Sequence, residues 1–304
     1  MSAMIVDDLT LTYDGGGGVR TVSMKAADRA VTAVIGPNGA GKTVLFSILA
    51  GLSSPQSGSV RFGKPDARVA FCPDVPQFEP WLSASEVVRA SLELTQRAPR
   101  RGGARAAERV DAALDACGLT VVAQRRIAAF SRGMLQRLGI AAALVTDPDI
   151  LILDEPSSAL DPVGRADVRA LVEVEKTRRC VVLSSHLLSE VEVLADHIVV
   201  LDGGTVVGQG TPAELVRAGR KPVWAVRFDA PISESVCEGL TPAPGMRLTR
   251  VARDQLILEF ATFADAASHL LPVVSEVGVP VLEIAPCGRD LDSFFARLLD
   301  GARA

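Results

Sequence analysis

The sequence has few cysteines, and they follow no pairing pattern. Their number is odd and none falls in a C-x-x-C spacing. The five positions are Cys72, Cys117, Cys180, Cys237 and Cys287. This scatter argues against a zinc site or a disulfide framework, and it predicts small buried side chains in a reducing compartment.

Long apolar runs and an excess of positive charge are also missing. No stretch approaches the ~20 apolar residues that span a bilayer, and residues 1–12 lack the basic and apolar regions of a secretory signal. The 36 acidic residues outnumber the 32 Lys and Arg, giving a formal net charge of -4. This balance argues against non-specific nucleic-acid binding. If the protein works at a membrane, we expect another chain to supply the spanning helices.

Apolar residues, by contrast, are abundant. They make up 48% of the 304 positions, which is enough for a packed core and excludes a disordered chain. At this length we expect one large domain and a smaller one. A Gly-Arg-Lys-Pro run places the boundary near residue 220, so the expected domains are 1–220 and 221–304.

One stretch matches the phosphate-binding P-loop pattern G-x-x-x-x-G-K-[ST]. Its residues are Gly36, Pro37, Asn38, Gly39, Ala40, Gly41, Lys42 and Thr43. Apolar residues predict a buried strand before it, at 30–35, and a helix after it, at 44–50. Glycines let backbone N–H groups approach phosphate oxygens, and the helix N-terminus adds positive charge. Lys42 is expected at the β- and γ-phosphates and Thr43 at Mg²⁺; the alternative is a glycine-rich turn that matches by chance.

Two carboxylates follow a second buried strand. Residues 150–153 are apolar, and Asp154 and Glu155 come directly after them. Carboxylates at the C-terminal edge of parallel strands are typical of α/β nucleotide sites. Asp154 is placed to hold Mg²⁺ and Glu155 to orient and deprotonate the attacking water. The alternative is a pair of helix-capping acids, which is disfavoured because residues 180–186 repeat the pattern of an apolar strand with a polar end.

The N-terminal region predicts an antiparallel flap. Residues 4–6, 9–13 and 19–24 have the composition of strands, with a glycine turn at 15–18. Tyr13 is the single tyrosine of the chain. It is interpreted as an aromatic that stacks on adenine, or as a tyrosine on an edge strand.

A helical subdomain is expected at about 82–138. Ser83 and Glu86 form a capping-box pattern that starts a helix, and a second helix follows at 104–117. Arginines between these helices indicate a solvated linker, or a site for anionic lipid or nucleic acid. The preceding loop at 73–81 holds three prolines and exposes apolar side chains. These either pack under the helices or form part of a docking groove for a partner.

The last 80 or so residues predict a small α+β domain. Their order of strand, helix, strand, strand, helix, strand over 223–285 is that of the ferredoxin-like split β-α-β. An amphipathic helix at 291–299 closes the chain. Such a domain would pair subunits or bind a small ligand, since fold alone does not give function.

Taken together, the motifs over residues 1–220 resemble the ATP-binding subunit of an ABC transporter. Residues 36–43 match its Walker A loop, Asp154 and Glu155 its Walker B pair, and Tyr13 its adenine-stacking aromatic. The family signature is matched by Ser131, Arg132, Gly133 and Met134. The D-loop is matched by Ser158, Ala159, Leu160 and Asp161, and the switch histidine by His186.

The resemblance implies a fold and a set of partners. The fold is a P-loop NTPase of the ABC type: a RecA-like α/β core, an antiparallel β subdomain and an inserted helical subdomain, here with the small ferredoxin-like domain. ATP and Mg²⁺ bind to one subunit and are covered by the signature of a second, in a homodimer. The signature form is similar to that of type-2 exporters of drugs, antibiotics or lipid-like compounds. A separate polytopic permease is then expected, with this chain on the inner face of the cell membrane and no nucleic-acid partner.

Two positions depart from the family pattern. Asp74 stands where the family has a glutamine that reaches Mg²⁺ and water, and we expect its carboxylate to contact the metal as well. Arg132 replaces the first signature glycine, which leaves Ser131 and Gly133 to contact the γ-phosphate. These departures keep one alternative open, a regulatory nucleotide-binding subunit that serves a more active partner. A second alternative is a soluble ABC-type ATPase acting on ribosomes or DNA, which the single P-loop and the lack of a basic face disfavour.

Overall fold

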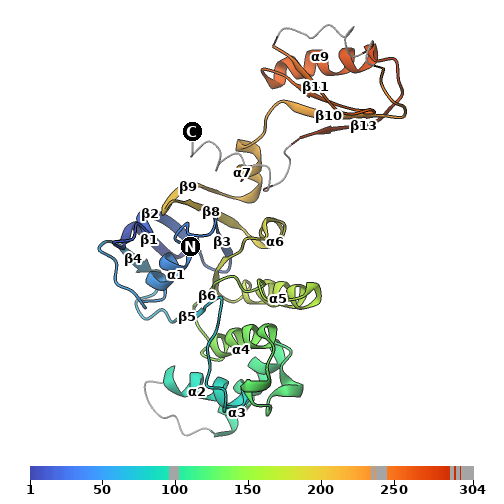
Figure 1. The fold of residues 1–304 in the computed structure, drawn as a ribbon. Coiled ribbons are helices and arrows are strands. Elements are labelled where there is room, and N and C mark those ends of the chain that lie inside the picture. Colours follow the sequence, from blue (N-terminus) through green and yellow to red (C-terminus); the bar gives the residue numbers. More distant parts are fainter. Residues whose placement is uncertain (96–102, 234–235, 237–244, 288–290, 292–294, 296–304) are drawn as a thin grey trace. The chain divides into compact units, whose positions relative to one another are not determined.

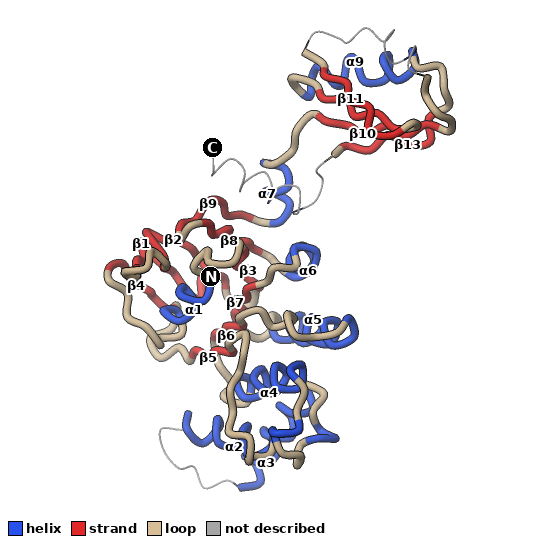
Figure 2. Tube along the Cα trace, in the orientation of Figure 1, coloured by secondary structure: helices blue, strands red, loops and turns tan. Residues whose placement is uncertain are grey.

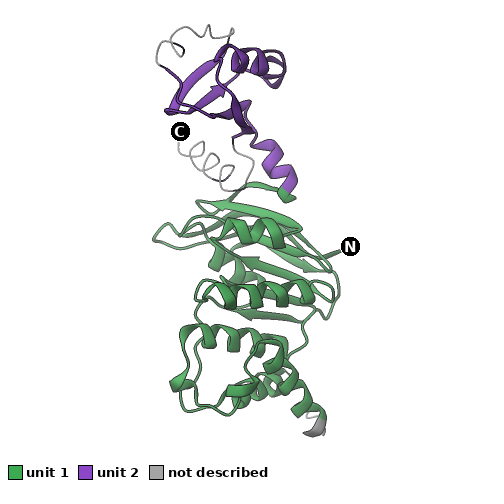
Figure 3. Ribbon diagram, turned by 90° about the vertical axis from the view of Figure 1, so that its right-hand side faces the viewer, with its two compact units in different colours: residues 1–212 green, residues 213–304 purple. Residues whose placement is uncertain are grey.

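The computed structural model describes residues 1–95, 103–233, 236, 245–287, 291 and 295. The chain divides into two compact units, residues 1–212 and 213–304 (Figure 3). The division comes earlier than the boundary expected near residue 220, because most of α7 (Pro212–Ala218) groups with the second unit. Among the described residues, the first unit contains two sheets and the second unit one, and each unit has its own buried core.

A six-stranded sheet forms the centre of the first unit (Figures 1 and 2). Its strands, in spatial order, are β5 (Val69–Cys72), β6 (Ile150–Leu153), β7 (Cys180–Ser184), β3 (Val31–Ile35), β8 (His197–Asp202) and β9 (Thr205–Gly210). All neighbouring pairs are parallel except β8 with β9. Every residue of β3, β6 and β7 is buried, as expected for apolar strands covered on both faces.

Helices cover one face of this sheet, and a second sheet lies on the other (Figure 1). The helices of the first face are α4 (Arg132–Leu144), α5 (Pro162–Glu175) and α6 (Leu188–Leu194). The opposite face carries α1 (Lys42–Leu49) and a three-stranded antiparallel sheet in the order β2-β1-β4. One apolar core joins the central sheet, α1 and the antiparallel sheet, and it includes the fully buried Met4, Leu9 and Phe46.

The antiparallel sheet contains the flap that the sequence predicts before the P-loop strand. Its strands are β1 (Ser2–Thr12), β2 (Gly18–Ala27) and β4 (Ser57–Phe62). The strand-like segments at 4–6 and 9–13 lie in or directly after one strand, β1, and the segment at 19–24 lies in β2. A register shift between Val6 and Leu9, where Asp8 has a φ of 48°, takes up the extra residues as a bulge and keeps the pairing on either side.

The helical subdomain is built as its capping signals predict. It contains α2 (Ala84–Thr95), α3 (Gly103–Ala116), two short 3-10 turns (Thr120–Val122 and Ile127–Ala129) and α4. The Glu86 carboxylate accepts from the Ser83 N–H at 2.7 Å, and the Ser83 hydroxyl accepts from the Glu86 N–H at 3.3 Å. This confirms the capping box. Most of the expected arginine linker lies outside the described residues.

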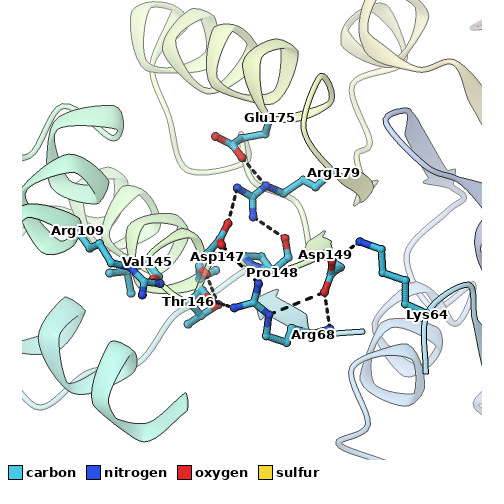
Figure 4. Close-up of polar contacts among 11 residues, drawn as sticks. Lys64, Arg68, Arg109, Val145, Thr146, Asp147, Pro148, Asp149, Glu175 and Arg179 are labelled. Carbon is cyan, nitrogen blue, oxygen red and sulfur yellow. Dashed lines mark hydrogen bonds and ion pairs between the residues drawn. The ribbon is translucent and has the colours of Figure 1, made fainter. Parts of the chain in front are cut away.

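A polar network fixes the segment between α4 and β6, at the end of β6 remote from Asp154 (Figure 4). Arg179 is 8% exposed; it donates to the Pro148 carbonyl at 2.5 Å and pairs with the Glu175 carboxylate at 2.6 Å. Arg68, just before β5, pairs with Asp149 at 3.8 Å. The network ties the start of β6 to α5 and β5, so the position of the strand that carries Asp154 and Glu155 is held from its other end.

The second unit contains a four-stranded antiparallel sheet in the order β11-β12-β10-β13. Its described elements are β10 (Val223–Phe228), β11 (Arg247–Ala252), β12 (Gln255–Glu259), α9 (Phe263–Glu276) and β13 (Val281–Pro286). This order places the first and third strands side by side at the centre, which is the split β-α-β arrangement. Most of the helices expected at 232–240 and 291–299 lies outside the described residues.

The described thiols give a first testable prediction. Cys72, Cys117 and Cys180 are buried, and burial raises the pKa of Cys117 and of Cys180 to about 12. The thiolate is the reactive form, so these thiols stay neutral at pH 8. We expect iodoacetamide to modify the partly exposed Cys287 first, and the three buried thiols only after unfolding. Mass spectrometry of native and denatured samples measures this; modification of Cys117 in the native protein within minutes would contradict it.

Candidate active site

The P-loop lies between the end of β3 and the start of α1, as the sequence predicts. Gly41 has a φ of 99°, and a Cβ there would lie 2.5 Å from the Gly18 carbonyl oxygen. Glycine alone adopts this positive φ readily and has no Cβ to collide with the Gly18 carbonyl. The backbone N–H groups of the loop therefore stay unobstructed. The Lys42 ammonium donates to the Gly36 carbonyl at 2.7 Å and to the Pro37 carbonyl at 3.3 Å. Its charge is therefore held inside the loop.

A chain of hydrogen bonds joins the P-loop to the ends of two neighbouring strands. The Thr43 hydroxyl donates to Asp154 Oδ2 at 2.9 Å, and the Ser184 hydroxyl donates to Asp154 Oδ1 at 2.6 Å. Asp154 is 2% exposed and Ser184 is fully buried. Because β7 pairs with β6, its last residue, Ser184, lies beside the end of β6 and reaches the Asp154 carboxylate.

Glu155 and His186 form a pair at the same edge of the sheet. The Glu155 N–H donates to the Ser184 hydroxyl at 2.8 Å, and Glu155 Oε2 lies 2.6 Å from His186 Nδ1. The Glu155 oxygen also accepts from the His186 N–H at 3.3 Å. Glu155 has a φ of 47°, in the left-handed region. Non-glycine residues occupy that region where surrounding contacts hold them there, and such positions cluster at functional sites.

Asp154, Glu155 and the P-loop surround a cavity of about 340 Å³. It is lined by the P-loop together with Tyr13, Asp74, Asp154 and Glu155. Tyr13 is 53% exposed, so its ring stands at the rim. His186 is outside the lining and reaches the cavity through Glu155.

The signature and D-loop residues form a separate cluster. Ser131 caps α4 by accepting from the Met134 N–H at 3.2 Å, and Arg132 is exposed. A Cβ on Gly133 would lie 3.0 Å from the Leu160 side chain, so the signature packs against Leu160 and the carbonyl of its neighbour Ala159. Asp161 caps α5 by accepting from the Gly164 N–H at 2.8 Å. Within the part of the chain that the structure describes, neither Ser131–Met134 nor Ser158–Asp161 lines the cavity.

Sequence reasoning missed two features of the site. Ser184 was expected only as a strand residue, although it makes hydrogen bonds with both carboxylate residues. Asp74 was expected to contact a metal, and in the structure its Oδ1 accepts from the Ser158 hydroxyl at 2.6 Å. A polar residue ending an apolar strand was the available signal for Ser184. The sequence carries none for the Asp74 contact, because it joins residues far apart in the chain.

A P-loop on a parallel sheet, linked through Thr43 and Asp154 to a Glu155–His186 pair, defines a nucleotide-hydrolysing domain of the P-loop class. A family model described as ABC transporter matches residues 19–158. The chain is 36% identical over 225 residues to the Uncharacterized ABC transporter ATP-binding protein YxlF of Bacillus subtilis (strain 168), covering 73% of this chain and 75% of that one. It is 30% identical to the Daunorubicin resistance ATP-binding protein DrrA3 of Streptomyces coeruleorubidus, covering 98% and 96% of the two chains.

A solved structure agrees with these relatives. The ATP-binding subunit of an ABC transporter matches with a TM-score of 0.64 at 26% identity, over 71% of this chain and 93% of that one. The chain belongs to the family of ABC transporter ATP-binding proteins. The predicted fold class is confirmed, and the protein is an ATP-binding subunit with the ATPase activity of its family.

Proposed function

We propose that this chain powers an ABC exporter as one of two ATPase subunits, coupled to a separate membrane-spanning permease. The observation that carries the proposal is the hydrogen-bonded series from Thr43 through Asp154 and Ser184 to Glu155 and His186. It holds a candidate metal site and a candidate base beside the P-loop. A relative aligned over nearly the whole chain is a daunorubicin resistance protein, which supports a drug, antibiotic or lipid-like compound as the cargo.

The residues at the P-loop fit Mg²⁺. The hydroxyl of Thr43 and the carboxylate of Asp154 lie 2.9 Å apart, and hard cations such as Mg²⁺ prefer oxygen ligands of this kind. Asp74 lines the same cavity, where its Oδ1 accepts a hydrogen bond from the Ser158 hydroxyl at 2.6 Å. Bound there, Mg²⁺ would neutralise negative charge that develops on the phosphates.

The remaining groups of the site have distinct proposed roles. Lys42 and the P-loop N–H groups bind the phosphates, and Tyr13 at the rim stacks on adenine. Glu155 accepts a proton from the attacking water. The contact between its Oε2 and His186 Nδ1 orients the carboxylate, and His186 also contacts the γ-phosphate.

Two copies of the chain would complete each other's sites. Ser131 and Arg132 are exposed, and the signature lies outside the cavity formed by its own P-loop. In the proposed pair, Ser131 and Gly133 of one subunit cover ATP held on the P-loop of the other. The γ-phosphate then joins the subunits, and hydrolysis releases them. We infer a homodimer because one chain carries both complementary surfaces.

A groove beside the helical subdomain is the proposed contact for the permease. It encloses about 300 Å³ between the loop at 73–78 and helices α2 and α4, with Phe71, Pro76 and Phe78 among its lining. Val75 and Trp81 stand nearby, 54% and 61% exposed. Within the described residues no helix is long and apolar enough to cross a bilayer. We therefore assign the membrane span, and the choice of cargo, to the partner.

A steady-state ATPase assay tests this proposal against its alternative, a regulatory subunit. The alternative is favoured by one observation, Arg132 in place of a signature glycine. We expect the purified chain to hydrolyse ATP, and excess EDTA to remove at least about 90% of the activity, because the phosphates lose their counter-charge. EGTA, which binds Mg²⁺ weakly, is the matched control. Hydrolysis that persists in EDTA would refute the metal site, and its absence in Mg²⁺ would favour the regulatory subunit.

A further inference from the structure

The loop that follows β5 is held from two sides within one chain. On one side, the Gln136 side chain of α4 donates to the Pro73 carbonyl at 3.5 Å. A Cβ on Gly139 would lie 2.6 Å from the Pro76 ring, so α4 and the loop are in close contact there. On the other side, Asp74 Oδ1 accepts from the Ser158 hydroxyl at 2.6 Å. The loop is therefore fixed between the helix that carries the signature and the turn that carries the D-loop.

Ser158 belongs to the turn that also positions Glu155. The Ser158 N–H donates to the Glu155 carbonyl at 3.1 Å, which closes the turn after β6. Glu155 itself has a left-handed backbone, a strained conformation that persists only where neighbouring contacts hold it. A side-chain anchor on Ser158 is such a contact. Both Ser158 and Asp74 are only partly exposed.

We propose that Asp74 is a positioning residue. It accepts a hydrogen bond from the Ser158 hydroxyl and so stabilises the turn that orients the Glu155 carboxylate. The inference rests on the proposed role of Glu155 as the base. A carboxylate is a stronger acceptor than the family's glutamine amide, so this departure from the pattern strengthens the link. Because the loop at 73–81 leads into α2, the Asp74–Ser158 contact also joins the helical subdomain to the hydrolytic turn.

Variants at both ends of the hydrogen bond test the proposal. We expect Ser158→Ala and Asp74→Ala each to lower kcat about tenfold, because losing a hydrogen bond to a charged group lowers a rate constant by about that factor or more when the bond stabilises the transition state. KM for ATP should change by less than about twofold, and the double variant should be no slower than either single one. Ser158→Thr keeps the hydroxyl and should restore most of the rate. Ser23→Ala is the matched control, because Ser23 donates to Asp8 at 2.9 Å, in the antiparallel sheet.

Mn²⁺ binding separates positioning from metal ligation. We expect the free Mn²⁺ signal in electron paramagnetic resonance, measured with a non-hydrolysable ATP analogue, to give the same affinity in wild type, Ser158→Ala and Asp74→Ala. Weaker Mn²⁺ binding in Asp74→Ala alone would overturn the inference and make Asp74 a metal ligand. Additive losses of kcat in the double variant would overturn it too. Failure of the wild type to hydrolyse ATP would count against the proposed function instead.

Discussion

Replacing Glu155 by glutamine is expected to lower ATP turnover by roughly 10²–10⁴-fold while ATP still binds. Glutamine keeps the size of the side chain but cannot accept a proton from water. It also retains an oxygen that can accept from the His186 N–H, so the turn after β6 should survive. Single-turnover hydrolysis gives the rate of the chemical step, and titration with a fluorescent ATP analogue gives the affinity.

A matched substitution separates this effect from a general loss of stability. Glu276 is an exposed glutamate at the end of α9, in the second unit. Glu276→Gln should hydrolyse ATP at the wild-type rate. Turnover by Glu155→Gln within about fivefold of wild type, with the control unchanged, would remove Glu155 from the role of base.

Replacing Lys42 by alanine is expected to weaken ATP binding by roughly 10- to 150-fold, because a hydrogen bond to a charged group contributes about 1.5–3 kcal/mol. Lys42 is 9% exposed and its ammonium is held within the loop by the Gly36 and Pro37 carbonyls. Removing it takes away the single side-chain cation of the P-loop sequence, whereas the backbone N–H groups remain. Equilibrium titration with labelled ATP measures the change.

The control for this prediction is another lysine. Lys25 is exposed on β2, and Lys25→Ala should bind ATP as the wild type does. Thermal unfolding of both variants would show whether the fold is intact. An unchanged ATP titration for a folded Lys42→Ala would contradict the assignment of phosphate binding to this loop.

Local patterns were sufficient to predict the parts of the site that are continuous in sequence. The P-loop was predictable because its glycines, the apolar run of β3 and the start of α1 follow one another in the chain. Asp154 and Glu155 were predictable because β6 is a fully apolar strand that ends directly before them. The capping box at Ser83 was predictable for the same reason, since its partners are three residues apart.

Contacts between distant segments were not predictable in this way. Ser184 bridges Asp154 and the Glu155 backbone because β7 lies between β6 and β3, and strand order is a property of the whole sheet. The Asp74–Ser158 contact likewise depends on two loops that meet only after β5 and β6 pair. The bulge at Asp8 within β1 likewise depends on pairing with both neighbouring strands.

Association driven by nucleotide is the most direct test of the account. Sedimentation velocity of the Glu155→Gln variant with ATP and Mg²⁺ should show the monomer converting to a dimer, and ADP in place of ATP should leave it monomeric. A monomer under both conditions, in a protein that still binds ATP, would contradict the claim that two copies complete each other's sites.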